Sequence, residues 1–165
     1  MRAPGFVPLS EPPRTMSIPF AIRFLLPCCL ALVFTPLQAA QQLTFGGFSY
    51  HFERDLGHNE VNPGIGYERD YDEKLSWSVG VFKNSLRRAA FFGTANYALW
   101  QPADGVRIGV TAGLSTGYHH AAVVPLVMPF AEWRIQRFGV QAYVVPTVKP
   151  YVDGAVVLQF KWRID

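Results

Sequence analysis

Three residues in this sequence could together form a proton-transfer site, with His51 as the proton carrier, Ser85 supporting it and Asn84 orienting it. His51 ends the first of a series of alternating apolar and polar segments, and Asn84-Ser85 follows the third. A histidine can take the proton of an attacking hydroxyl, and a neighbouring polar group can orient its ring. The combination is compatible with general-base chemistry. The alternatives are a lumen hydrogen bond of His51 beside Glu53, and ordinary hairpin-loop chemistry for Asn84-Ser85.

Eight segments separated by turn residues would position these side chains. In the third, large apolar residues at Trp77, Val79 and Val81 alternate with the small or polar Ser78 and Gly80. A period of two indicates a strand with one face in an apolar medium. The other predicted strands include residues 43–54, 89–101, 106–115, 138–145 and 155–164.

The pattern predicts an all-β fold, an eight-stranded antiparallel transmembrane β-barrel over residues 41–165. Its apolar side chains face outward and its small or polar side chains face the lumen. The alternative is a soluble lipocalin-like barrel or sandwich with its large residues inside. The low share of charged residues, 16%, and the Gly-rich faces opposite the apolar ones favour the membrane barrel. Two interfacial girdles are expected from the aromatic residues near strand ends: Tyr67, Trp100, Trp133, Tyr143 and Trp162.

Residues 1–40 are predicted to be a secretory signal peptide, with Met16 as a plausible initiator. The apolar run FAIRFLLPCCLALVFTPL is too short for a transmembrane helix and ends in the cleavage-compatible residues QAA. Both cysteines, Cys28 and Cys29, lie in this segment, so the exported part is expected to contain no disulfide or thiol chemistry. Pro27 disfavours the alternative that Cys28 is a lipoprotein anchor.

The exported part is nearly neutral and carries no cofactor signature. From residue 41 onward, twelve Lys and Arg oppose eleven Asp and Glu, a formal charge of +1, which gives no argument for nucleic-acid binding. We expect no cofactor, because the sequence has no phosphate-cradling glycine loop and no zinc ligand set. His119-His120 alone is a weak metal signal, so no metal is expected.

The order of several short motifs resembles the lipid A palmitoyltransferase (PagP-like) outer-membrane barrels over about residues 50–162. The motifs are NPGIGYERD, WSVGVFKNS, GVRIGVTAG, PLVMPFAEW and FKW. The resemblance implies a barrel of the cell outer membrane, expected to be a monomer, that transfers a palmitoyl-like chain from a phospholipid to lipid A. It implies that His51 and Ser85 are site residues, with Asn84 where the family has Asp.

Asn84 is a departure with a chemical consequence. An asparagine can hold an imidazole by a hydrogen bond but cannot stabilise its charged form, and loss of the carboxylate in a serine-protease triad lowers the rate by about four orders of magnitude. Asparagine nevertheless orients the histidine of Cys-His sites. A non-catalytic barrel for adhesion or envelope integrity, or a lipid deacylase using water, are therefore the alternatives. The family's amphipathic helix before the first strand is also missing.

Prolines and arginines complete the predicted site. Pro125, Pro129 and Pro146 remove ladder donors, and in the resembled family such breaks admit acyl chains; a bulge without function is the alternative. Arg87 and Arg88 lie in the loop that contains Asn84-Ser85, where they are suited to lipopolysaccharide phosphates, or are simply a solvated loop.

Overall fold

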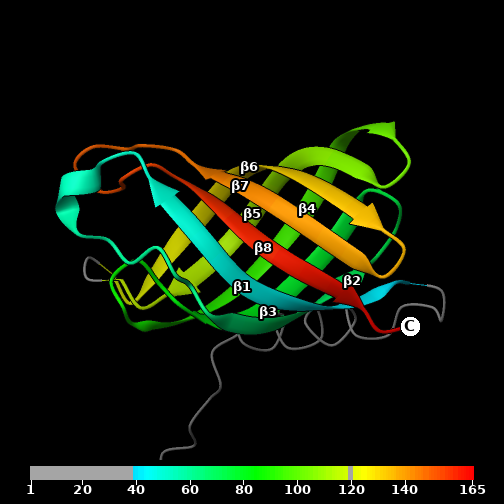
Figure 1. Cartoon of the computed structure of the whole chain (residues 1–165), viewed down its shortest axis with the longest axis horizontal. Coiled ribbons are helices and arrows are strands. Elements are labelled where there is room, and N and C mark those ends of the chain that lie inside the picture. Colours follow the sequence, from blue (N-terminus) through cyan, green and yellow to red (C-terminus); the bar gives the residue numbers. More distant parts are fainter. Residues whose placement is uncertain (1–38, 119–120) are drawn as a thin grey trace, which may run out of the picture. The chain divides into compact units, whose positions relative to one another are not determined.

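The computed structural model describes residues 39–118 and 121–165. The predicted signal peptide up to residue 38 lies outside the described residues, with Met16, Cys28 and Cys29, and so do His119 and His120. Eight antiparallel strands follow one another in sequence order and close into a barrel (Figure 1), which confirms the predicted fold class. The strands are β1 (Gln41–His51), β2 (Gly64–Asp70), β3 (Leu75–Lys83), β4 (Ala89–Ala103), β5 (Val106–Thr116), β6 (Val123–Ile135), β7 (Phe138–Val145) and β8 (Ala155–Arg163).

The two ends of the barrel differ in their connections. At the terminal end, β1 begins, β8 ends, and short turns join the other strands. At the loop end are four longer connections: L1 (residues 52–63), L2 (residues 84–88), L3 (residues 117–122) and L4 (residues 146–154). L1 contains a short 3-10 helix, Arg54–Leu56. Because β1 and β3 both run toward the loop end, His51, Asn84 and Ser85 come to the same end, as the order and alternating direction of the strands predict.

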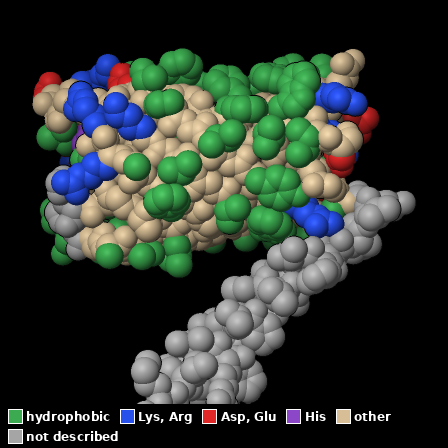
Figure 2. Space-filling model, turned by 90° about the horizontal axis from the view of Figure 1, so that it is seen from below, with side chains coloured by type: hydrophobic (Ala, Val, Ile, Leu, Met, Phe, Trp, Pro, Cys, Tyr) green, Lys and Arg blue, Asp and Glu red, His purple; other side chains and the backbone are tan. Residues whose placement is uncertain are grey.

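The outer wall of the barrel is apolar, as a lipid-facing surface must be. Figure 2 shows hydrophobic side chains over the barrel wall and charged side chains toward its two ends. Trp100, Trp133 and Trp162 point outward with 62%, 56% and 47% of their surface exposed, and all three lie near the terminal end. Tyr143 is 8% exposed and points into the lumen, so its predicted place in a girdle is wrong. These three tryptophans therefore form a girdle at the terminal end.

No helix of the described ranges is long and apolar enough to cross a membrane.

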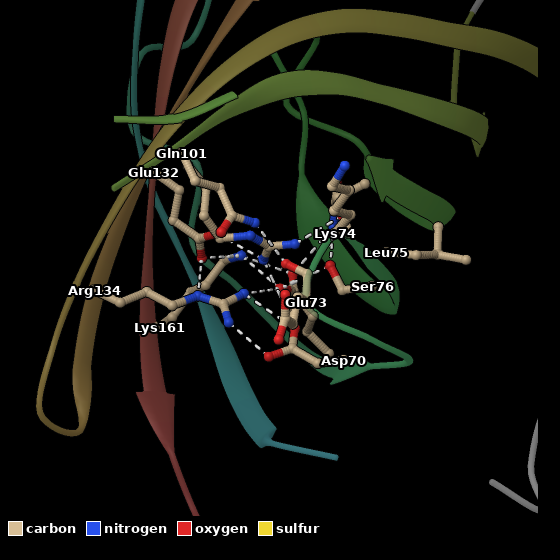
Figure 3. A network of polar contacts seen from close by, with 12 residues as sticks. Asp70, Glu73, Lys74, Leu75, Ser76, Gln101, Glu132, Arg134 and Lys161 are labelled. Carbon is tan, nitrogen blue, oxygen red and sulfur yellow. Dashed lines mark hydrogen bonds and ion pairs between the residues drawn. The ribbon is translucent and has the colours of Figure 1, made fainter. Parts of the chain in front are cut away.

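The lumen near the terminal end is filled by charged side chains (Figure 3). The Nζ of Lys161 lies 2.8 Å from Oε1 of Glu68 and 2.7 Å from Oε1 of Glu132. Arg134 contacts the same two carboxylates and also Asp70, at 2.6 Å. Arg107 adds a third cation, 3.1 Å from Glu132. Three cations thus face three carboxylates, and this charge-balanced network closes the lumen toward the terminal end.

The lumen near the loop end is lined mainly by apolar side chains. Every second residue of β6 points inward, and in the loop-end half these are Val124, Leu126, Met128 and Phe130. Across the lumen, Phe92 of β4 and Phe82 of β3 meet edge to face with ring centroids 5.9 Å apart. Except for the buried Phe130, these side chains keep partial exposure, whereas the lysine and glutamates of the network are fully buried. The two halves of the lumen therefore differ in both chemistry and accessibility.

Glycines let the aromatic pair fit against the wall. A Cβ on Gly80 would lie 2.7 Å from the ring of Phe92, and a Cβ on Gly66 would lie 3.2 Å from it. Gly109 and Gly113 instead allow close approach of the β4 backbone, whose carbonyl oxygens would lie 2.0 and 2.2 Å from an added Cβ. Gly109 and Gly113 therefore have a packing role between neighbouring strands.

The hydrogen-bonded ladder between β6 and β7 covers only the terminal half. It runs from Ile135↔Phe138 to Phe130↔Tyr143 and stops there. The next seven residues of β6, residues 123–129, pair with β5 but not with β7. Proline has no N–H to donate to a neighbouring strand. The ladder between β5 and β6 is unbroken through Pro125 and Pro129, so the lack of these two donors is consistent with the unpaired edge toward β7.

The pairing of β1 with β2 also ends early, but backbone contacts of L1 close that side. Beyond Phe45↔Ile65 the chain forms an isolated bridge, Phe48↔Val61, and hydrogen bonds from Ser49 N to Glu60 O and from Asn62 N to Gly47 O, both 2.9 Å. At the loop end, the barrel wall is therefore more open between β6 and β7 than between β1 and β2.

Candidate functional site

His51 lies at the last position of β1 with its side chain turned into the lumen, as predicted. The residue is 6% exposed, and its Nδ1 is buried without a hydrogen-bond partner among the described residues. The alternative of a lumen hydrogen bond beside Glu53 finds no partner there, because Glu53 binds Lys149 of L4. An imidazole nitrogen left free in a partly apolar environment is costly unless a ligand or water satisfies it. This makes His51 the strongest candidate for a reactive group.

Asn84 is fully occupied by the structure of its own loop. Its Oδ1 accepts hydrogen bonds from the backbone N–H groups of Leu86 and Arg88, both at 3.0 Å, and its Nδ2 donates to the carbonyl of Gly117 at 2.9 Å. The residue is completely buried. The structure brings Asn84 to the end of the barrel where His51 lies, but its amide ties L2 to L3 and forms no hydrogen bond with that imidazole.

Ser85 contacts L1 through its backbone. Its carbonyl oxygen accepts a hydrogen bond from Asn59 N at 2.8 Å, and the side chain of Asn59 lies 3.4 Å from the carbonyl of Asn84. Ser85 therefore lies beside L1, which also contains the residues that follow His51. In the described part of the chain, no hydrogen bond joins its hydroxyl to His51.

Two residues that were not predicted as site residues, His58 and Asp153, extend from His51. The ring of His58 in L1 stacks on it with centroids 4.4 Å apart and a tilt of 32°. His58 Nε2 also lies 3.1 Å from Oδ2 of Asp153 in L4. A carboxylate thus stands one imidazole away from His51. No local pattern indicates this, because His58 and Asp153 are 95 positions apart and both lie in irregular loops.

Asp153 is held in place by several contacts of L4. Lys149 Nζ lies 3.4 Å from its Oδ1, and the N–H of Phe52 donates to the carbonyl of Gly154 at 2.9 Å. Partial burial acts to raise the pKa of Asp153, but the hydrogen bonds from His58 and Lys149 outweigh it and leave the pKa below the ordinary value. The carboxylate is therefore ionised at neutral pH.

Arg87 and Arg88 are exposed on L2, together with Lys83 at the end of β3. Arg87 Nη1 donates to the carbonyl of Gly57 at 3.2 Å. Among the described residues, these three cations have no carboxylate partner, whereas Arg54 and Lys149 at the same end pair with Glu60 and Glu53. L2 therefore presents an uncompensated positive charge.

The three predicted prolines lie around the open stretch between β6 and β7. Pro125 and Pro129 are exposed on the outer face of β6, and Pro146 follows the last residue of β7. L4 begins at Pro146 and leans toward L1, to which its contacts through Lys149, Asp153 and Gly154 are made. The prolines are thus grouped at one lateral break rather than spread around the barrel.

Acidic residues, histidines and cysteines do not gather in threes anywhere in the described ranges at a spacing that suits a metal ion.

Comparison with known proteins gives little beyond the fold. No protein-family model matches the chain, and no curated protein matches it. Among solved structures, the chain is similar to the N-terminal β-barrel domain of Pseudomonas aeruginosa OprF, with a TM-score of 0.47 and 13% identity over 76% of this chain and 97% of that domain. The resemblance to the lipid A palmitoyltransferases stays a prediction. The chain folds as an eight-stranded closed barrel with an apolar outer wall.

Proposed function

We propose that this protein is a lipid-handling barrel of the outer membrane that takes one acyl chain of a membrane lipid into the loop-end half of its lumen. The observation that carries the proposal is the break between β6 and β7, which begins where the apolar lining of the lumen begins, at Phe130. A lipid chain is apolar and moves laterally in the bilayer, so it needs an opening in the wall rather than at the end of the barrel. The break and the lining meet that need together.

The chemistry that we propose is transfer of the chain from a phospholipid to lipid A. His51 is the proton-carrying group, since it lies at the top of the apolar half with a free Nδ1. The unpaired charges of Arg87 and Arg88 are suited to the phosphates of the lipid headgroups, which arginine binds in a bidentate manner. The charged network below forms a floor that would stop the chain near the middle of the barrel.

A second candidate is a non-catalytic small barrel that serves adhesion or envelope integrity. It is favoured by Asn84, whose side chain is fully used in joining L2 to L3 and offers nothing to His51. A lipid deacylase that uses the same site with water as acceptor is a variant of the first proposal. These possibilities make different lipid products.

The first experiment is mass spectrometry of lipid A and of free fatty acids from cells that express the protein or its His51→Ala variant. Acyl transfer predicts a lipid A mass gain of one acyl chain that is lost in the variant, and deacylation predicts free fatty acid instead. A matched control is Ser49→Ala, which changes a neighbouring inward residue of β1. Neither product from a correctly inserted barrel would favour the non-catalytic candidate.

A crosslink tests the route of the chain. If the β6–β7 ladder continued in register, Met128 would face Val145, so Met128→Cys with Val145→Cys allows a disulfide that closes the break. Oxidation is expected to abolish transfer, and reduction to restore it. The control pair, Ala131→Cys with Ala142→Cys, lies in the intact part of the ladder, where a disulfide should leave transfer unchanged. Equal loss in both pairs would exclude the break as the route.

A further inference from the structure

Two imidazoles and one carboxylate form a chain at the loop end of the barrel. His51 is buried, the ring of His58 stacks on it with centroids 4.4 Å apart, and Oδ2 of Asp153 lies 3.1 Å from Nε2 of His58. The side chains of His58 and Asp153 are 14% and 29% exposed, so a ligand can reach them. The chain of groups runs from the apolar half of the lumen to the surface of L4.

The charges of the two imidazoles are coupled. Two positive rings at this distance would repel each other, so a proton on one ring disfavours a second proton on the other. Asp153 contacts His58 but not His51, and a carboxylate favours the charged form of the imidazole that it contacts. The geometry thus gives the two rings different surroundings: the carboxylate contacts His58, and Nδ1 of His51 has no hydrogen-bond partner among the described residues. Near this pair the charged groups are Arg54, Glu60, Lys149 and Glu53, which pair with one another.

We propose that His51 and His58 act as a base and acid pair in the cleavage of an acyl ester, with Asp153 as the carboxylate that positions His58. This inference rests on the proposed function, because it names the groups that would carry out acyl transfer at that site. It also supplies the carboxylate that Asn84 does not provide. Asp153 is a positioning residue, and the two histidines are the groups that meet the substrate.

The proposed reaction balances with these groups alone. The hydroxyl of the acceptor loses its proton to Nδ1 of His51 while its oxygen bonds to the carbonyl carbon of the ester. When the tetrahedral intermediate collapses, the bond from that carbon to the ester oxygen breaks, and His58 gives its proton to the leaving oxygen. A proton then passes from His51 to His58, which restores the starting state. Water in place of the acceptor hydroxyl gives hydrolysis by the same steps.

A comparison of two esters tests the acid role directly. A p-nitrophenyl ester has a leaving group that needs no proton, whereas the glycerol ester of a phospholipid has one that does. The folded protein in detergent micelles is given each ester with the same acyl chain, and fatty acid release and transfer to lipid A are measured. The variants are His58→Gln, Asp153→Asn, Asp153→Glu and His51→Ala. Glu53→Gln, which removes another contact between L1 and L4, is the control.

The expected pattern separates an acid from a structural contact. His58→Gln and Asp153→Asn should lower kcat on the phospholipid at least about 100-fold with little change in KM, and should lower cleavage of the p-nitrophenyl ester less than about tenfold. Asp153→Glu should restore part of the loss. His51→Ala should lose both activities, and Glu53→Gln should change neither by more than about twofold.

Each other outcome has a defined meaning. Equal losses on both esters, or a loss in Glu53→Gln as large as in Asp153→Asn, would show a structural contact and overturn the inference. Unchanged transfer in His58→Gln would overturn it and leave the proposed function in place. Ester cleavage with the expected pattern but no transfer to lipid A would refute the proposed function and support the pair. A wild-type protein without activity on any of these substrates would overturn both.

Discussion

The two halves of the lumen are built from the same strands and hold opposite chemistry. Near the terminal end, Glu68, Glu132 and Lys161 are buried in a network in which every charge has a partner. Near the loop end, Phe92 and Met128 are only half-buried, and the wall beside them is not fully paired. One half therefore stabilises and seals the barrel, while the other retains partial exposure and contains the candidate site. The division suggests that stability and function are carried by separate layers of one barrel.

The largest expected effect comes from breaking the network. Lys161→Met removes one of the two cations that contact both Glu68 and Glu132 and leaves the buried carboxylates in excess, which should destabilise the barrel by about 3–5 kcal/mol. The measurement is urea unfolding of the protein folded in lipid vesicles. The double variant Lys161→Met with Glu68→Met should recover part of the loss, because it removes the unpaired charge as well. Lys149→Met, whose side chain is 55% exposed, is the surface control, and an equal loss there would contradict the comparison.

A smaller effect is expected from the aromatic pair. Phe92→Ala removes the ring that packs on Phe82 and Gly80. Because the ring is only half-buried, we expect the free energy of unfolding to fall by about 2 kcal/mol. If this half accepts an acyl chain, the same change should lengthen the chain found on lipid A by mass spectrometry. Phe91→Ala changes the outward neighbour, 66% exposed, and should alter neither quantity strongly. A stability loss as large as that of Lys161→Met would remove the distinction between the two halves.

Asn84→Asp tests whether this position is structural. The change replaces a donor 2.9 Å from the carbonyl of Gly117 by a carboxylate oxygen, so we expect a loss of about 1–3 kcal/mol and no gain in transfer. Thermal unfolding and lipid A mass spectrometry measure the two parts. Ser85→Ala, in the same loop, is the control. A higher transfer rate with unchanged stability would instead show that position 84 lacks a catalytic carboxylate.

The smallest effect concerns acid. The pKa of Asp153 is lower in the folded protein than its ordinary value of about 4. Its ionised carboxylate therefore stabilises the contact between L1 and L4 fully above about pH 4. This stabilisation is lost as the pH falls through the pKa of the folded protein. We expect faster hydrogen exchange at the amide of Phe52, which donates to Gly154, below about pH 4 after correction for intrinsic rates. Asp153→Asn should remove this pH dependence. The amide of Gln141, in the interior of β7, should show no such change.

The sequence predicted the strands well where their two faces differ. In β5, Val106, Ile108 and Val110 alternate with Arg107 and Gly109, and the structure places them outside and inside as expected. It did not resolve β6, where both sets of alternate residues are apolar and only the closed barrel shows which set is inside. Tyr143 was misplaced for a related reason, since a tyrosine suits a membrane interface as well as a hydrogen bond to Gln159 in the lumen.

What the sequence determined by itself is the barrel, because the period of two is a local property that each strand carries in its own residues. It also brought His51 and Asn84-Ser85 to one end, because strand direction follows from strand count. Only the tertiary structure decided which side chains meet. The partners of His58, of Asn84 and of the charges in the network come from distant strands and loops, and their contacts depend on register and barrel closure, which no single segment encodes.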